Sequence, residues 1–134
     1  MLDPHGALIY TMVIVSAADS NMTDAELAII GAIVGHLPVF RDFDRDSLPR
    51  VLEACSQLLS REDGLEEAFA EIKQVLSANL RETAYALACD VAAVDGDAAQ
   101  EELRVLELIR HRLNIDRLIA AGIERGARAR FQRL

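Results

Sequence analysis

The sequence predicts an all-α fold, a single-domain bundle of about seven helices with an internal pseudo-two-fold helix-turn-helix duplication. Hydrophobic residues make up 51% of the chain, but aromatic residues only 4%. Strands favour aromatic and β-branched residues with frequent turn signals, so this composition favours helices. Apolar residues also recur at helical spacing, without the alternation of a strand. The third observation is a repeat: an apolar helix, an acidic turn and an amphipathic helix occur twice, 76 positions apart.

The two copies, residues 15–30 and 91–106, align over an oxygen-rich turn as well as over hydrophobic positions. An apolar pattern can recur through composition alone, whereas an acidic turn that recurs in register indicates a shared structural or functional role. The aligned pairs are Asp19 with Asp95, Asn21 with Asp97, Glu26 with Glu102 and Leu27 with Leu103.

The first helix pair is predicted from its apolar residues and its boundary residues. A helix over 5–18 includes an uncharged run of twelve residues, which is too short to span a bilayer and predicts a buried helix. The segment Thr23-Asp-Ala-Glu26 is a capping-box sequence that starts the next helix, over 23–37. Pro38 then ends that helix.

The rest of the chain continues as helices joined by short connectors. Phe40 and Phe43 are expected to hold the charged connector 39–46 against the core. Further helices are expected to begin near Ser47 and to cover about 65–77, 79–94, 98–112 and an Arg-rich last segment. We therefore expect one domain over 1–134, with repeat halves at roughly 5–38 and 79–114, linking helices within 47–77 and a C-terminal helix within 115–134.

The charge distribution restricts the partners of this chain. The formal net charge is −8, which argues against nucleic-acid binding because that needs a basic face. Residues 117–134 carry five arginines against one acid, a local balance of +4 that leaves about −12 for the rest. This suits cation binding on the body and an acidic partner at the tail. The alternative is a solvated last helix whose arginines complement its C-terminus.

The cysteines indicate a structural role and a reducing compartment. Cys55 and Cys89 lie in apolar helical patterns, with no Cys-x-x-Cys motif and no histidine at zinc-ligand spacing. We expect buried, reduced thiols and a cytoplasmic protein. The first residues lack the basic region of an export signal, which agrees with that location.

The sequence does not predict an enzyme. His5, His36 and His111 are isolated, and the chain has no nucleophile elbow and no Gly-rich phosphate loop. An enzyme is compatible with the sequence only if its carboxylates hold a catalytic metal.

The acidic turns have two interpretations. Asp19-x-Asn21 and Asp95-Gly96-Asp97 have the oxygen ligands that Ca²⁺ and Mg²⁺ prefer, and Glu26 and Glu102 follow one helical turn later. The spacing is not that of a twelve-residue EF-hand loop. The other interpretation is helix capping, by Thr23 and Glu26 in the first copy. The residue that matches Thr23 is Ala99, whose side chain cannot cap, although Asp97 with Gln100 offers a substitute.

Asp90 is a further acidic residue, on the mostly apolar helix predicted at 79–94. A buried carboxylate needs a partner. Asp90 therefore joins a cation site, pairs with an arginine, or faces solvent.

The segment Tyr85-Ala-Leu-Ala-Cys-Asp90-Val-Ala-Ala-Val-Asp95-Gly96, together with Ala-Ala-Asp19…Thr23-Asp-Ala-Glu26-Leu27, resembles the tellurite-resistance TerB-like family over nearly the whole chain. The resemblance implies an all-helical bacterial protein, linked to tellurite and chemical-stress resistance, that binds divalent cations, chiefly Ca²⁺, through acidic residues. It implicates Asp19, Glu26, Asp95 and Glu102, with Asn21, Asp97 and Asp90 in support. Ser20 replaces Gly96 in the first copy, which puts that site in doubt.

Two functions follow as hypotheses. The first is a non-enzymatic, cation-binding scaffold for a protein partner. The second is a metal-free interaction module, in which the Arg-rich end binds an acidic protein or makes peripheral contact with an anionic membrane. The ion, the partner and the oligomeric state are left open by the sequence.

Overall fold

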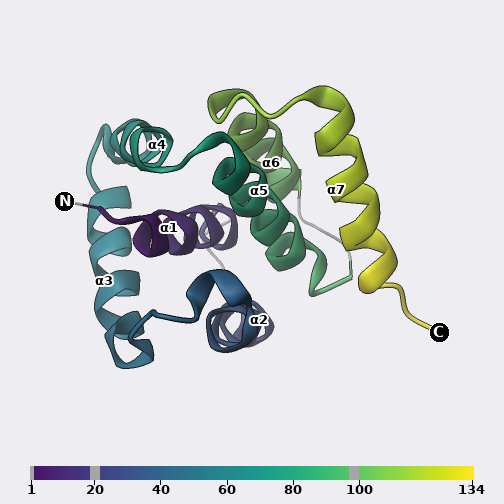
Figure 1. Cartoon of the computed structure of the whole chain (residues 1–134), viewed down its shortest axis with the longest axis horizontal. Helices are drawn as coiled ribbons and strands as arrows, with labels where there is room; N and C mark the ends of the chain where they lie inside the picture. The colour runs from purple at the N-terminus through teal and green to yellow at the C-terminus, as the bar shows by residue number, and fades with distance from the viewer. Residues whose placement is uncertain (1, 19–21, 97–99) are drawn as a thin grey trace.

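The computed structural model describes residues 2–18, 22–96 and 100–134, and these residues form seven α-helices and two short 3₁₀ helices. No strand occurs in these ranges, which confirms the all-α prediction. The helices are α1 (Pro4–Ser16), α2 (Asp24–His36), α3 (Leu48–Leu59), α4 (Gly64–Val75), α5 (Ala78–Ala93), α6 (Gln100–Arg112) and α7 (Arg117–Arg130), with 3₁₀ helices at Pro38–Phe40 and Arg45–Ser47 (Figure 1).

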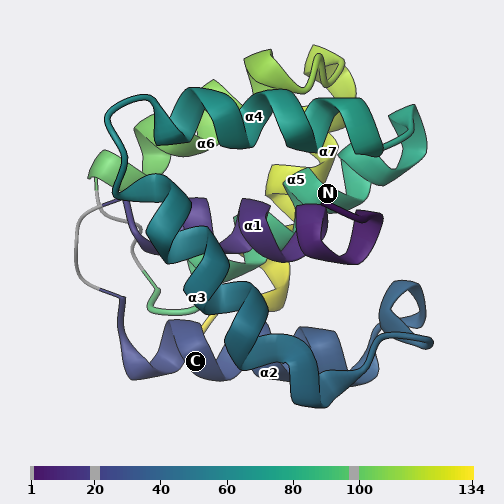
Figure 2. The same cartoon turned by 90° about the vertical axis from the view of Figure 1, so that its left-hand side faces the viewer.

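Helix α1 lies in the middle of the bundle (Figures 1 and 2). Every residue from Gly6 to Ser16 is buried, on all sides of the helix. Helices α2, α3, α4, α5 and α6 all contact it. A helix that is apolar all round is stable only when other elements surround it. The uncharged run predicted as a buried helix is therefore the centre of the core.

Helix α5 is the second core helix and joins the two sides of the molecule. It packs against α1, α2, α6 and α7. The two predicted helix pairs contact each other reciprocally, since α2 packs on α5 and α6 packs on α1. This arrangement agrees with a pseudo-two-fold relation, while the internal duplication itself stays a prediction.

Side-chain caps decide where several helices begin. Asp3 Oδ1 accepts a hydrogen bond from the amide of Gly6 at 2.8 Å at the start of α1. The predicted capping box of α2 is present in both directions. Ser77 caps α5, so α4 ends at Val75, two residues before the predicted end. The boundaries follow from cap chemistry, which satisfies amides that the helix leaves open.

The connector between α2 and α3 is pinned to the core as predicted. Phe40 is 3% exposed, and its ring stacks on His5 of α1 at 5.5 Å between centroids. Phe43 packs edge-on against His5 at 5.3 Å. His5 Nε2 lies 2.8 Å from the carbonyl oxygen of Val39, which adds a polar link. The two 3₁₀ helices of this region were not predicted, because three-residue turns leave no periodic pattern.

One glycine sets the turn between α3 and α4. A Cβ atom on Gly64 would lie 1.8 Å from the carbonyl oxygen of Leu58, a contact that no side chain tolerates. The tight α3–α4 hairpin therefore requires glycine at this position.

Cys55 and Cys89 are both buried and unpaired, as predicted. Among the described residues, no helix has both the length and the apolar character needed to cross a bilayer.

The central position of α1 leads to a stability prediction. Leu8 is fully buried, so the substitution Leu8→Ala should lower the free energy of unfolding by about 2–5 kcal/mol through lost burial and a cavity. Leu118 is 81% exposed, and Leu118→Ala should change it by less than about 0.5 kcal/mol. Urea unfolding measures both. Equal losses for the two variants would contradict the central role of α1.

Candidate functional site

Thr23, the N-cap of α2, contacts carboxylates from both halves of the chain. The Thr23 hydroxyl donates a hydrogen bond to Asp95 Oδ2 at 3.1 Å, across 72 positions of sequence. The Thr23 amide donates to Glu26 Oε1 at 2.9 Å, and Thr23 Oγ1 accepts from the Glu26 amide at 3.1 Å. One carboxylate from each half of the chain therefore contacts the residue that caps α2.

Glu26 is held by more than its capping box. It is only 2% exposed, and its Oε1 atom also accepts a hydrogen bond from the buried hydroxyl of Ser16 at 3.2 Å. The helix-capping interpretation is therefore confirmed for Glu26. Ser16 was not predicted as a partner of Glu26. The sequence feature that could have indicated it is a hydroxyl at the end of a largely apolar helix.

Glu102 repeats the burial of Glu26. It is 5% exposed in the first turn of α6. Shifting the positions of Ser16 and Thr23 by 76 residues gives Ala92 and Ala99, which have no hydroxyl. The hydroxyl contacts that Glu26 makes through Ser16 and Thr23 therefore have no equivalent in the second copy.

The cation-ligand prediction falls partly outside the residues that the structure describes. Asp19, Asn21 and Asp97 are not among them. Over residues 2–18, 22–96 and 100–134, no group of three or more His, Cys, Asp or Glu side chains is placed to hold a metal ion. The cation site thus stays a prediction, with the Thr23 contacts as its structural frame.

Asp90 pairs with an arginine, one of the three alternatives considered. Its carboxylate, 17% exposed, forms an ion pair with Arg130 of α7. The contact fixes α7 to α5, and a second polar contact does the same: the Tyr85 hydroxyl donates to Glu124 Oε2 at 2.6 Å. Neither partner was identified from the sequence, because the spatial neighbours of α5 depend on how α7 folds back.

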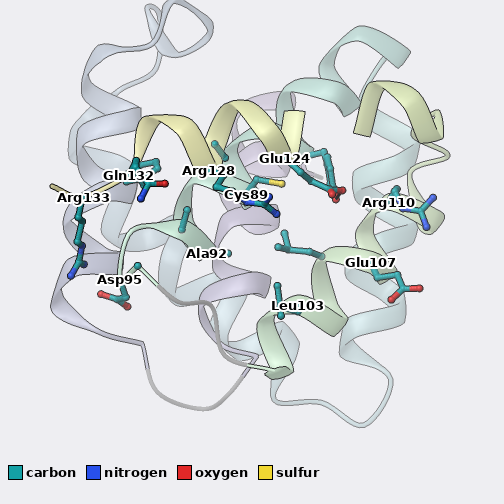
Figure 3. A pocket seen from close by; sticks show the side chains of 16 residues that line it. Cys89, Ala92, Asp95, Leu103, Glu107, Arg110, Glu124, Arg128, Gln132 and Arg133 are labelled. Atoms are coloured by element: carbon teal, nitrogen blue, oxygen red, sulfur yellow. Dashed lines mark hydrogen bonds between the residues drawn. The ribbon is translucent and has the colours of Figure 1, made fainter. Parts of the chain in front are cut away.

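A groove of about 870 Å³ runs between α5, α6 and α7. Figure 3 shows it, with Leu103, Glu107 and Arg110 on the α6 side and Glu124, Arg128 and Gln132 on the α7 side. No local sequence pattern predicts this groove, because α6 and α7 border it through their packing on α5.

The second acidic turn forms one end of this groove. Asp95 and Gly96 line it, together with Arg133 from the segment after α7. Gly96 has a φ of 94°, a conformation that favours glycine. A Cβ at Gly96 would lie 3.3 Å from Cζ of Arg133, so the guanidinium packs directly on the turn. A positive group of the chain itself therefore lies beside the second acidic turn.

Burial suppresses the ionisation of Tyr85 in the groove and of both cysteines. Burial raises the pKa of Tyr85 well above its usual range, and the hydrogen bond to Glu124 raises it further. Burial also raises the pKa of Cys89 to about 12, and that of Cys55 to about 12. The thiols are therefore protonated at neutral pH, a state in which cysteine is a poor nucleophile and a poor metal ligand.

Comparison with known protein families identifies the family of this chain. The family model described as tellurite resistance protein TerB matches residues 5–122 of the 134 residues. The chain belongs to the TerB family. The match confirms the resemblance noted in the sequence, and it includes both acidic turns together with helices α1 to α6. It associates the protein with a tellurite-resistance family. Searches of the curated proteins and of the solved structures gave no match.

The Thr23–Asp95 contact predicts energetic coupling between the two halves of this TerB-family protein. In a double-mutant cycle of Thr23→Ala and Asp95→Ala, we expect a coupling of about 0.5–1 kcal/mol in the free energy of unfolding. Among the described residues, the Thr83 hydroxyl bonds within α5, to the carbonyl oxygen of Asn79, so Thr83→Ala should be additive with Asp95→Ala. Urea unfolding gives all values. Additivity in the first cycle would show that the contact contributes nothing.

The raised thiol pKa values predict a loss of stability in alkali. The ordinary pKa of a cysteine thiol is about 9, and both thiols have a higher pKa in the folded chain. The contribution of such a thiol to the stability of the fold is fully present below pH 9. That contribution is lost as the pH rises from about 9 to about 12. The free energy of unfolding should fall over this range, and it should fall less in a variant with Cys55→Ala and Cys89→Ala. Equal falls would show that the thiols do not contribute.

Proposed function

We propose that this TerB-family protein is a non-enzymatic, stress-associated protein that binds a divalent cation, Ca²⁺ or a similar ion, at its acidic turns and presents a surface to a protein partner. The proposal is carried by one observation: Glu26 and Asp95, one from each half of the chain, both contact Thr23. Hard cations bind clusters of carboxylate and carbonyl oxygens. The two halves thus supply carboxylates to the same end of the bundle.

The charge balance of the chain supports a cation beside Thr23, where the two halves supply carboxylates. The chain outside residues 117–134 has a net charge of about −12. Asp24, Glu101 and Glu102 lie in the first turns of α2 and α6, next to the acidic turns in sequence. Like charges at short range repel, so a divalent cation would relieve repulsion that the folded chain otherwise contains.

The same geometry suggests how a cation would act on a partner surface. Asp95 contacts the N-cap of α2 and also lines the groove between α5, α6 and α7. An ion bound at the turns would therefore order one end of that groove. In this proposal the cation is structural, and the protein partner is the functional target.

A second candidate function is a metal-free interaction module that uses α7. The contacts of Arg130 with Asp90 and of Glu124 with Tyr85 hold this helix on α5. The remaining arginines of the helix, Arg117, Arg125 and Arg128, are exposed. They favour an acidic protein or an anionic membrane surface as the partner.

The cation proposal predicts a metal-dependent increase in stability. Metal-stripped protein should unfold at a higher temperature when Ca²⁺ is added, because an ion that binds only the folded state stabilises it by about 2.7 kcal/mol at a hundredfold excess over Kd. Mg²⁺, Mn²⁺ and Zn²⁺ are compared in parallel, and differential scanning calorimetry is the measurement.

A matched pair of variants makes this test specific. Asp95→Asn removes the charge but keeps an oxygen that can accept from Thr23, so it should lose most of the metal-dependent increase. Asp42→Asn makes the same change at an exposed position of the α2–α3 connector, and it should behave as the parent. An equal increase in both variants, or no increase with any ion, would disprove the cation site.

A further inference from the structure

We propose that the groove between α5, α6 and α7 binds an amphipathic helix of a partner protein whose apolar face is flanked by acidic side chains. This inference rests on the interaction role proposed above, and it is independent of the cation site. It assigns that role to one surface and one chemistry of partner.

The shape of the groove suits a helix. Helix α5 forms the floor with small side chains, Cys89, Ala92 and Ala93, so a partner can approach closely. Helices α6 and α7 pack on α5 and form the two walls. A helix laid between two walls on a helical floor is a common mode of peptide recognition.

The walls offer one exposed apolar side chain beside others that are partly covered. Leu103 is 50% exposed, one of the few large apolar side chains on the described surface. It lines the groove with the half-buried Leu106 of the same helix and, from the other wall, with the half-buried Phe131 and the buried Ala127. An exposed apolar side chain in a concave site favours a partner that buries it.

Two of the three acidic side chains that line the groove already accept hydrogen bonds within the protein. Glu124 accepts from the Tyr85 hydroxyl at 2.6 Å, and Asp95 accepts from Thr23 at 3.1 Å. A basic partner would have to compete for these carboxylates.

The arginines of the groove are placed differently. Arg110 on α6 and Arg128 on α7 line opposite walls, as Figure 3 shows. In the part of the chain that the structure describes, Nη2 of Arg110 lies 3.1 Å from Nε2 of the His111 imidazole, and neither guanidinium pairs with a carboxylate. Guanidinium groups bind carboxylates through paired, directional hydrogen bonds. Acidic side chains on both flanks of an incoming helix would therefore be bound from both walls.

The charge of the whole molecule favours the same docking site. Residues 117–134 have a net charge of +4, whereas the rest of the chain has about −12. An acidic partner is therefore repelled by most of the surface and attracted to the side that carries α7. An anionic membrane also carries negative charge, but a flat bilayer surface does not fill a concave groove.

The test uses the full chain and a display library of random 16-residue peptides. Selected peptides should be rich in Asp and Glu, with apolar residues spaced three and four apart. Fluorescence anisotropy then compares the selected peptides on two charge-reversal variants. Arg128→Glu should weaken binding by about tenfold or more, because it places a like charge in the groove. Arg125→Glu is the matched control, since Arg125 is exposed on the same helix but does not line the groove, and it should change affinity less than threefold.

The outcomes separate this inference from the interaction role on which it rests. Peptides that bind both variants equally, or that are rich in Lys and Arg, would disprove the groove assignment but leave an interaction role elsewhere on the surface. A library that yields no binder, combined with binding to phosphatidylserine vesicles that both variants lose alike, would overturn the inference in favour of a membrane surface. Calorimetry with Ca²⁺ tests the cation site separately.

Discussion

The fold depends on burying a helix that has no polar side. Helix α1 is uncharged from Ala7 to Ser16, and all of these residues are buried. Such a helix is stable only if neighbours cover its whole circumference, and five other helices do so. Helices α2 to α6 pack directly on α1, and α5 connects this core to α7.

The polar contacts at the end of α1 link that core to the acidic turns. Ser16, the last residue of α1, donates to Glu26, which also accepts from the amide of Thr23. Thr23 in turn donates to Asp95 from the other half of the chain. A buried carboxylate must be satisfied by nearby donors, and this chain of contacts satisfies Glu26 while it positions Asp95. Capping and cation binding are therefore compatible, because the same residues that cap α2 bring the carboxylates together.

Charge is distributed unevenly along the chain, with an acidic body and an Arg-rich C-terminal segment. The acidic turns lie at the start of α2 and α6, and the arginines gather on α7. The two sides meet at one end of the α5–α6–α7 groove, where Asp95 and Arg133 both line the wall. A cation at the turns and an acidic helix in the groove would thus bind adjacent surfaces of opposite charge. This proximity gives the cation proposal a structural route to partner binding.

Local sequence patterns determined the helices of this protein and the chemistry of its turns. Helical periodicity, the capping box at Thr23 and the stop at Pro38 act over a few residues, so they could be recognised without any contact information. The uncharged run of α1 also predicted its burial, since no other environment suits it. The family resemblance, carried by the motifs around Asp19 and Asp95, was likewise available from the sequence and is confirmed by the TerB match.

Only the tertiary structure decided which distant residues meet. Four contacts depend on how the helices pack: Thr23–Asp95, Ser16–Glu26, Asp90–Arg130 and Tyr85–Glu124. Packing angles are set by the sum of many weak side-chain contacts rather than by any local motif. The groove exists for the same reason, because α6 and α7 share α5 as a support. The sequence therefore determined which groups this protein has to offer, and the packing of α1 and α5 decided where those groups lie.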